Sequence, residues 1–183
     1  MKTRITILAL ALLRIAAMAD PNEDEEKFLL VRGAHKFYRG TDEMTFNRPE
    51  LPKPVLSLLD HLDWGNVDGS KPDSFVGYAI DLNKDGKTEF LIETIEGGSG
   101  GPAFVVLADM KGTWTTIGYF QGGFYIIPVA SNWPQLVVIS RGGGGVYSKA
   151  RFDFDSGSYR MTVAELYDRG KITKKIISKN TKG

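Results

Sequence analysis

The chain has 183 residues, of which 25% are charged and 42% hydrophobic, and its formal net charge is +1. This balance excludes the strongly basic proteins that bind nucleic acids or anionic membranes through clustered positive charge, so we expect no nucleic-acid partner. The absence of cysteine excludes disulfides and thiolate metal sites.

The first 19 residues have the layout of a secretory signal peptide. Two basic residues, Lys2 and Arg4, precede an apolar run over residues 5–13. Ala17-Met18-Ala19 then places small residues at positions −3 and −1 of a cleavage site. The alternative is an amphipathic N-terminal helix of the folded protein, which the late Arg14 favours. The run is shorter than the about 20 apolar residues of a membrane span. We expect export to the periplasm or secretion, with no integral membrane association.

Residues 20–74 are expected to form an N-terminal segment with one or two short helices. Asp20-Pro21 and the acidic residues after it resemble a helix start, although a strand suits the apolar residues 28–31 nearly as well. Residues 39–54 contain three prolines and are expected to be a loop. Pro54 then opens a second helix over residues 55–62, with its apolar side chains on one face.

The rest of the chain predicts an all-β fold of mostly antiparallel sheets. Short runs rich in β-branched and aromatic residues alternate with glycine-containing turns, as in sheet proteins. The expected strands are Phe75–Asp81, Thr88–Thr94, Ala103–Asp109, Trp114–Phe120, Phe124–Val129, Gln135–Ser140, Ser148–Phe154, Tyr159–Leu166 and Ile172–Ile177. We therefore expect one β-rich domain over residues 20–183.

An internal repeat divides this domain into two units, residues 75–120 and 121–166, followed by a C-terminal strand and tail over 167–183. At an offset of 45, the segment Leu91–Thr94 aligns with the segment Leu136–Ile139. The same offset brings the glycine run 97–100 onto 142–145. A period near 45 is typical of four-stranded propeller blades. Two units predict either two packed antiparallel sheets or a partial propeller.

The stretch Asp81 to Glu89 has the form D-x-N-x-D-G-x-x-E and predicts a calcium site. Alternate residues of a tight loop point the same way, so side-chain oxygens can converge on one cation, and Gly86 permits the sharp turn. Oxygen ligands at this spacing favour Ca²⁺. The expected ligands are Asp81, Asn83, Asp85, Glu89 and the main-chain carbonyl of Lys87.

Two other interpretations of the acidic loop were considered. An EF-hand would need a glutamate at loop position 12, where this chain has Ile92, and a helix after it. A plain hairpin turn remains the alternative, because Asp-Gly alone is a common hairpin signal.

The loop and the apolar strand after it resemble the FG-GAP and VCBS repeat families, the units of integrin-α-like propellers. Their hallmark is D-x-[DN]-x-D-G-x-x-[DE], here Asp81 to Glu89, leading into Phe90-Leu91-Ile92. The resemblance covers about residues 75–166. The second unit departs from the pattern, since residues 130–132 replace the acidic loop. The resemblance implies a β-sheet unit, a structural Ca²⁺ and a role in adhesion or recognition rather than catalysis.

The glycine loops are the expected recognition surface, because loops between strands carry binding residues and aromatic and arginine side chains dominate binding hot spots. The expected contacts are Trp133, Arg141, Tyr147 and Ser99. Ser99 also lies in Gly-Gly-Ser-Gly-Gly-Pro, similar to the nucleophile segment of chymotrypsin-like proteases. The 64 residues between His35 and Ser99 are too few for the usual first barrel, so this interpretation is set aside.

The sequence therefore predicts an exported, non-catalytic binding protein with a structural calcium ion and a protein or cell-wall partner. Inhibitors of cell-wall hydrolases, or immunity proteins against them, fit this size and compartment. The alternative is an extracytoplasmic hydrolase that uses carboxylates such as Glu93, Glu96 and Asp109 as acid and base.

Overall fold

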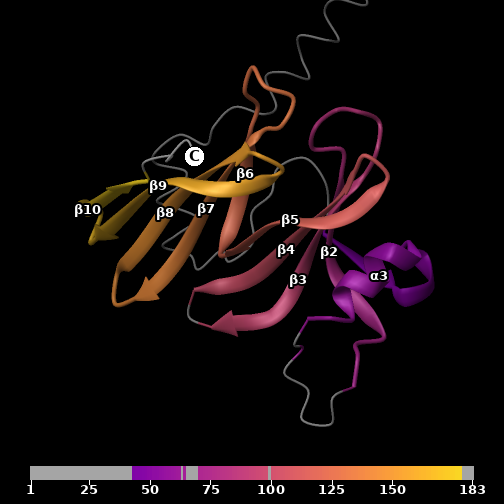
Figure 1. Cartoon of the computed structure of the whole chain (residues 1–183). Helices are drawn as coiled ribbons and strands as arrows, with labels where there is room; N and C mark the ends of the chain where they lie inside the picture. The colour runs from indigo at the N-terminus through magenta and orange to yellow at the C-terminus, as the bar shows by residue number, and fades with distance from the viewer. Residues whose placement is uncertain (1–42, 63, 65–69, 99, 179–183) are drawn as a thin grey trace, which may run out of the picture.

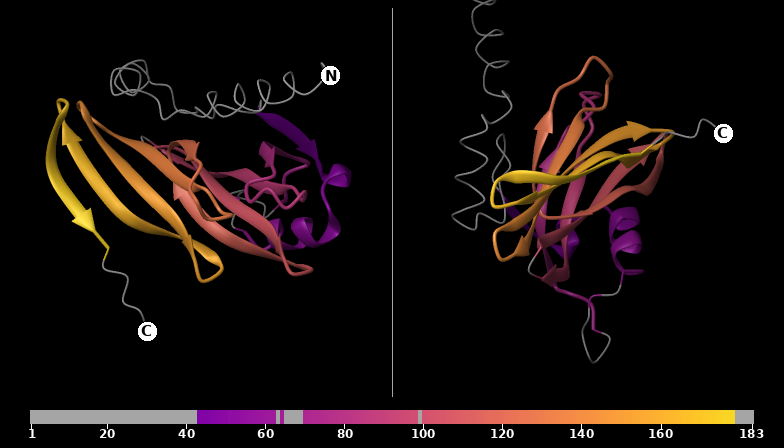
Figure 2. Two further views of the ribbon diagram at one scale, coloured as in Figure 1. Left: turned by 90° about the horizontal axis from the view of Figure 1, so that it is seen from above. Right: turned by 90° about the vertical axis from the view of Figure 1, so that its left-hand side faces the viewer.

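A computed structural model describes residues 43–62, 64, 70–98 and 100–178, with the main chain alone over 95–98. The predicted leader, the first predicted helix, Ser99 and the side chain of Glu96 lie outside what it describes. Two five-stranded antiparallel sheets make up the described chain, so the predicted all-β class is confirmed. Figures 1 and 2 show the sheets side by side, with the second projecting past the first.

The first sheet has the order β1-β2-β3-β4-β5 and the second the order β10-β9-β8-β7-β6. The strands are β1 (Met44–Asn47), β2 (Ser74–Ile80), β3 (Glu89–Gly98), β4 (Gly101–Met110), β5 (Thr113–Gln121), β6 (Gly123–Ile127), β7 (Gln135–Gly143), β8 (Val146–Asp155), β9 (Ser158–Asp168) and β10 (Lys171–Ile177). All nine predicted strands are present, because their β-branched and aromatic residues suit a pleated, buried surface.

The predicted loop over residues 39–54 was wrong in its described part. Residues 44–47 form β1, which pairs with β2, and Arg48–Glu50 form a 3₁₀ helix. β1 exists because Phe46 is buried against the edge of the Phe90 ring, a contact that its four-residue sequence alone cannot reveal. The second predicted helix is present as α3 (Lys53–Leu59), with a proline in its first turn.

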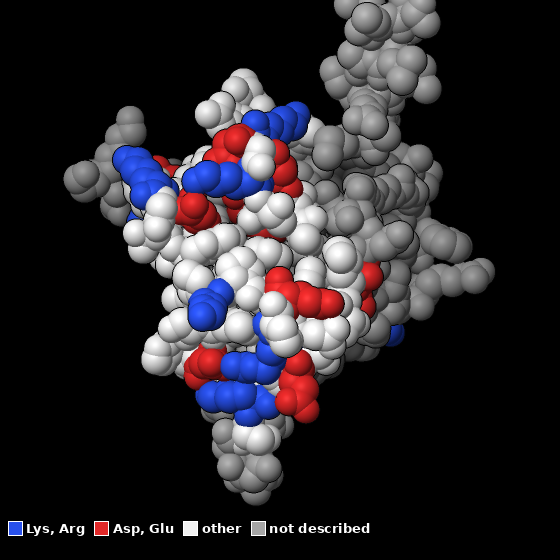
Figure 3. All heavy atoms as spheres, turned by 90° about the vertical axis from the view of Figure 1, so that its right-hand side faces the viewer, with Lys and Arg blue, Asp and Glu red and all other residues white. Residues whose placement is uncertain are grey.

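The helix covers the outer face of the first sheet. Its buried residues Val55 and Leu59 belong to a cluster with Phe75, Ile92 and Leu107. Figure 1 shows α3 beside β2 on the side away from the second sheet. Figure 3 shows that on this side of the molecule acidic and basic side chains are interspersed rather than separated by sign.

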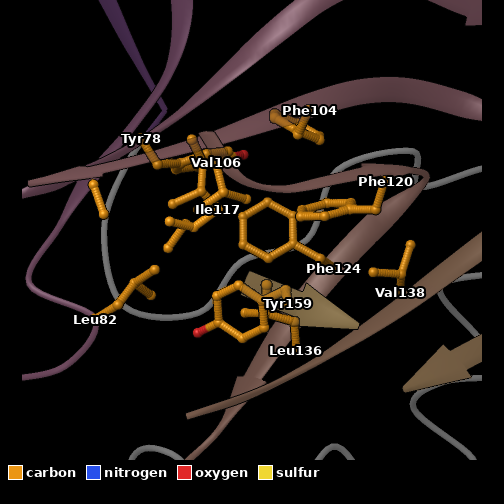
Figure 4. Packing of buried hydrophobic residues seen from close by; sticks show 12 residues of the cluster. Tyr78, Leu82, Phe104, Val106, Ile117, Phe120, Phe124, Leu136, Val138 and Tyr159 are labelled. Carbon is orange, nitrogen blue, oxygen red and sulfur yellow. The ribbon is translucent and has the colours of Figure 1, made fainter. Parts of the chain in front are cut away.

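The central core lies between the two sheets. Four aromatic rings from both sheets, Tyr78, Phe104, Phe120 and Phe124, form five tilted or edge-on pairs with centroids 5.3–6.0 Å apart. Figure 4 shows these rings with the aliphatic side chains that complete the cluster. Such aromatic packing adds to the stability that burial alone supplies.

The two halves of the chain repeat the same meander, β2–β5 in the first sheet and β6–β9 in the second. The glycine run 97–100 joins β3 to β4, and the run 142–145 joins β7 to β8. β4 and β5 meet at a turn with two positive φ angles, at Lys111 and Gly112, and β8 and β9 meet at one with Ser156 and Gly157. The two runs thus lie at corresponding positions. The arrangement is two packed sheets, the first of the two predicted alternatives.

The pairing of residues across the strands shows that the offset between the two repeat units is not 45 throughout. The β-bulge between Val106 and Leu107 has its counterpart between Arg151 and Phe152, which fixes the offset at 45 for β4 and β5. The row that crosses the first meander is Ala79, Phe90, Leu107 and Thr116, and its counterpart is Ile126, Leu136, Phe152 and Met161. The offset is therefore 46 for β3 and 47 for β2, and Leu136 is the counterpart of Phe90, not of Leu91.

The same alignment exchanges the two faces of the sheets. Phe90 and Leu107 pack in the cluster under α3, on the outer face of the first sheet. Their counterparts Leu136 and Phe152 pack in the central core. The face of the second sheet that packs into the central core therefore corresponds to the face of the first sheet that packs under α3. The two sheets do not contact each other through equivalent faces.

Candidate metal centre

The acidic loop connects β2 to β3 over residues 81–88. β2 brings the chain to the edge of the core, and Leu82 anchors the loop by packing into the central cluster. Gly86 has φ +85° and no heavy atom within 4 Å of where a Cβ would lie. The loop thus turns sharply at a glycine and is otherwise solvent-exposed.

Side-chain oxygens hold the loop in this turn. Both Asp81 carboxylate oxygens accept main-chain N–H groups, from Asp85 at 3.1 Å and from Gly86 at 3.0 Å. The Asn83 amide oxygen accepts the N–H of Asp85 at 2.9 Å, and the Asp85 carboxylate accepts that of Lys87 at 2.8 Å. Three of the predicted ligands are therefore drawn toward the same short stretch of main chain.

Glu89 is the first residue of β3, and its side chain connects the end of the acidic loop to its start. Its side chain is only 1% exposed, and its Oε2 accepts the N–H of Leu82 at 2.7 Å. Burial raises the pKa of the Glu89 carboxyl to about 7; the Leu82 amide opposes this shift, and the charges of Asp85 and Asp81 add to it. A buried carboxyl beside two further acids is the kind of group that a bound cation stabilises.

The two lysines of the loop, Lys84 and Lys87, are the ammonium groups nearest to the proposed ligands in sequence. Lys87 Nζ lies 2.8 Å from Asp109 Oδ2 on β4, outside the loop. This hydrogen bond raises the pKa of Lys87 and lowers that of the Asp109 carboxyl. Lys84 has a left-handed φ of 60° at the exposed tip of the loop. The lysine side chain nearest in sequence to Glu89 is thus engaged by a different acid.

The described residues contain no group of three or more His, Cys, Asp or Glu side chains placed to hold a metal ion. The predicted set does not depend on carboxylates alone, because it includes the Asn83 amide and the Lys87 carbonyl. Oxygen ligands of these kinds suit Ca²⁺ in both charge and number. The types of donor therefore fit the ion, but Asp81, Asp85 and Glu89 are not gathered around one point in this structure, and their carboxylates would have to move together to bind it.

The corresponding loop of the second meander, between β6 and β7, faces the acidic loop across a shallow groove. The groove has a volume of about 260 Å³ and is lined by Leu82, Asn83, Lys84, Asp85, Pro128, Val129, Ser131, Asn132 and Pro134. The acidic loop therefore lies where the two sheets meet.

Two of the predicted partner contacts, Arg141 and Tyr147, lie elsewhere, on the second sheet. Arg141 on β7 is directly opposite Tyr147 on β8, and Tyr147 is opposite Tyr167 on β9. The rings of Tyr147 and Tyr167 stack at 4.6 Å with an interplanar angle of 7°. Arg141 is exposed and the two tyrosines are half-buried. We call these three residues the arginine–tyrosine row.

Tyr167 was missed by sequence reasoning. No local signal could have found it, because counting back from the Ser156-Gly157 turn pairs Tyr147 with Leu166. The β-bulge between Arg151 and Phe152 shifts the register by one residue and brings Tyr167 opposite Tyr147. Trp133 takes a different position: its ring stacks on Phe154 at 4.2 Å and meets Tyr159 edge-on, against the central core. The structure thus brings Arg141 and Tyr147 together and places Trp133 apart from them.

The carboxylates of the alternative hydrolase hypothesis are not brought together where they are described. Glu93 is opposite Phe104, so it lies five residues along β4 from Asp109, or roughly 17 Å at strand spacing. Phe104 packs in the central core, and Asp109 follows the opposite alternation, so the two acids also lie on opposite faces. A catalytic pair needs about 5–10 Å.

Comparison with known proteins gives no relative: no protein-family model, no curated protein and no solved structure matches the chain. In the described part of the chain, no helix is long and apolar enough to cross a membrane.

Proposed function

We propose that this is an exported, non-catalytic binding protein of the FG-GAP/VCBS-like kind, with one structural Ca²⁺ held by the acidic loop. The observation that carries the proposal is the buried Glu89 carboxyl next to a loop in which the carboxylates of Asp81 and Asp85 accept neighbouring main-chain N–H groups. An uncompensated buried acid costs stability, and a bound divalent cation removes that cost.

The ion would act on the fold rather than on a substrate. Its ligands come from the end of β2, the loop and the start of β3, so binding fixes the connection between two core strands. The glycine runs lie at the other end of β3 and β7. A partner that binds at the glycine end therefore does not touch the ion.

The partner surface that we propose is the arginine–tyrosine row. Arginine and tyrosine are enriched at binding hot spots, and stacked rings present contact area that is already ordered. The partner would be a protein or cell-wall component outside the cytoplasm. Inhibition of a cell-wall hydrolase, or immunity to one, is the activity that this size and compartment suit.

The test is affinity capture from an extracytoplasmic extract with wild type, Arg141→Ala and Arg160→Ala. Arg160 is the same residue type on β9, opposite Asp153 and far from the glycine run. We expect one partner with wild type and Arg160→Ala, and strongly reduced capture with Arg141→Ala. Equal capture by all three would refute the assignment of the row.

A further inference from the structure

The hydroxyl of Tyr159 is an unexplained polar group in the central core. Tyr159 is the second residue of β9 and is 7% exposed. Its hydroxyl oxygen is buried and has no hydrogen-bond partner in the described part of the chain. A buried hydroxyl without a partner is costly, since it gives up its bonds to water and gains none in exchange.

The direction of this hydroxyl points to the acidic loop. Figure 4 shows the Tyr159 oxygen turned toward Leu82 and away from the aromatic rings of the core. Leu82 is the residue whose N–H donates to Glu89. Burial and then the negative charge of Glu89 raise the pKa of the Tyr159 hydroxyl.

The ring of Tyr159 also contacts two aromatic side chains of the second half of the chain. It meets the Trp133 ring edge-on at 6.2 Å and the Phe154 ring edge-on at 5.4 Å. Trp133 belongs to the β6–β7 loop, the counterpart of the acidic loop. Tyr159, a residue of the second sheet, therefore contacts the β6–β7 loop with its ring and turns its hydroxyl toward Leu82 of the acidic loop.

We propose that Tyr159 is a positioning residue for the calcium site, whose hydroxyl donates a hydrogen bond to the Glu89 carboxylate, directly or through one water molecule, when Glu89 binds the ion. This inference rests on the proposed function. It adds that the site is completed from the second sheet, so that metal binding fastens the two sheets together.

Such a role predicts opposite effects of the hydroxyl on stability without metal and on calcium affinity. A hydroxyl that is useful only in the metal-bound state costs stability without metal and supports affinity with it. A tyrosine that serves only packing would show no effect on calcium affinity when its hydroxyl is removed.

The experiment compares wild type with Tyr159→Phe and Tyr78→Phe. Tyr78 lies in the same core cluster, but its hydroxyl meets Glu43 at 3.4 Å. Calcium affinity is measured by calorimetric titration, and stability is measured by melting in chelator. We expect Tyr159→Phe to bind Ca²⁺ about tenfold more weakly and to melt no lower than wild type in chelator. Tyr78→Phe should keep the wild-type calcium affinity.

Equal affinities for wild type and Tyr159→Phe would overturn the inference and leave the calcium site standing. A wild type that binds no Ca²⁺ would overturn both. If Tyr159→Phe fails to fold, the wild type still decides: among the ring Cζ carbon resonances of its seven tyrosines, that of Tyr159 should shift as Ca²⁺ is added. A Tyr159 resonance that stays fixed at calcium saturation would overturn the inference.

Discussion

At the scale of single residues, Glu89 carries the energetic argument for the metal site. Its ordinary pKa of 4.5 is raised to about 7 in the fold, so the folded protein holds this proton more tightly than the unfolded chain. The stability contributed by the bound proton is fully present below pH 4.5. It is lost as the pH rises to about 7, and amounts to about 3 kcal/mol.

Glu89→Gln should therefore remove this pH dependence. Glutamine keeps an oxygen for the Leu82 N–H but carries no proton to lose. In chelator at pH 7.5 we expect the variant to be more stable than wild type, with the two converging near pH 4.5. Denaturant unfolding across this pH range measures the difference. A wild type and a variant with parallel profiles would show that Glu89 ionises normally.

Asp85 is one of the three acids among the proposed ligands, and its carboxylate also accepts the N–H of Lys87 within the loop. Asp85→Asn retains an oxygen for the Lys87 N–H and removes one charge, so the turn should persist. We expect calcium affinity to fall at least about tenfold, because ligand charge sets affinity in such loops.

The matched control is Asp155→Asn in the β8–β9 turn, where Asp155 accepts a hydrogen bond from Ser156. Calorimetric titration should give this control the wild-type affinity. A fall of the same size in both variants would mean that net charge, and not ligation by Asp85, governs binding.

At the scale of elements, Gly122 is the link on which the packing of the two sheets depends. It has φ +131°, and a Cβ there would lie 2.3 Å from the Ile139 carbonyl oxygen. Its N–H donates to the Pro102 carbonyl at 2.8 Å. We expect Gly122→Ala to destabilise the fold by about 3 kcal/mol or more, through backbone strain and a clash with a core strand.

Gly112→Ala is the comparison for this prediction. Gly112 also has a positive φ, +88°, but no heavy atom lies within 4 Å of its Cβ position. Only conformational strain remains there, about 1 kcal/mol. Denaturant unfolding of both variants measures the two costs. Equal losses would show that the close approach at Ile139 relaxes easily.

Much of this element structure could be predicted from the sequence. The strands were predictable because alternating β-branched residues and Gly turns act locally. β1 was not predictable, since it is stabilised by the contact between Phe46 and the ring of Phe90, which is distant in sequence. The repeat was visible, but its offset of 46 and 47 in the early strands was not, because register is set by pairing across strands.

The features of the candidate site also divide into local ones, which the sequence predicts, and ones that depend on other strands. The acidic loop itself was predictable because the residues of its motif lie within nine positions, and its ligand set stays a prediction. The burial of Glu89, the Lys87–Asp109 ion pair and the approach of Tyr159 come from other strands, and no local pattern carries them. Tyr167 was predictable only after the hairpin register was known.

At the scale of the whole molecule, the leader pattern of residues 1–19 predicts export. Intact-mass analysis of the protein from its native compartment should find a chain that begins at Asp20. Full-length protein recovered from the cytosol alone would contradict the prediction.

The central claim is that Ca²⁺ binds the acidic loop and stabilises the fold, and melting of the wild type in millimolar Ca²⁺ and in chelator tests it most directly. An extracellular module of this kind binds with a dissociation constant of about 10⁻⁴ to 10⁻³ M. At a hundredfold excess over that constant, the free energy of unfolding should rise by about 2.7 kcal/mol, because the unfolded chain cannot hold the ligands together. The account predicts a clearly higher melting temperature in Ca²⁺; superimposable curves would mean that the loop is a hairpin turn and binds no calcium.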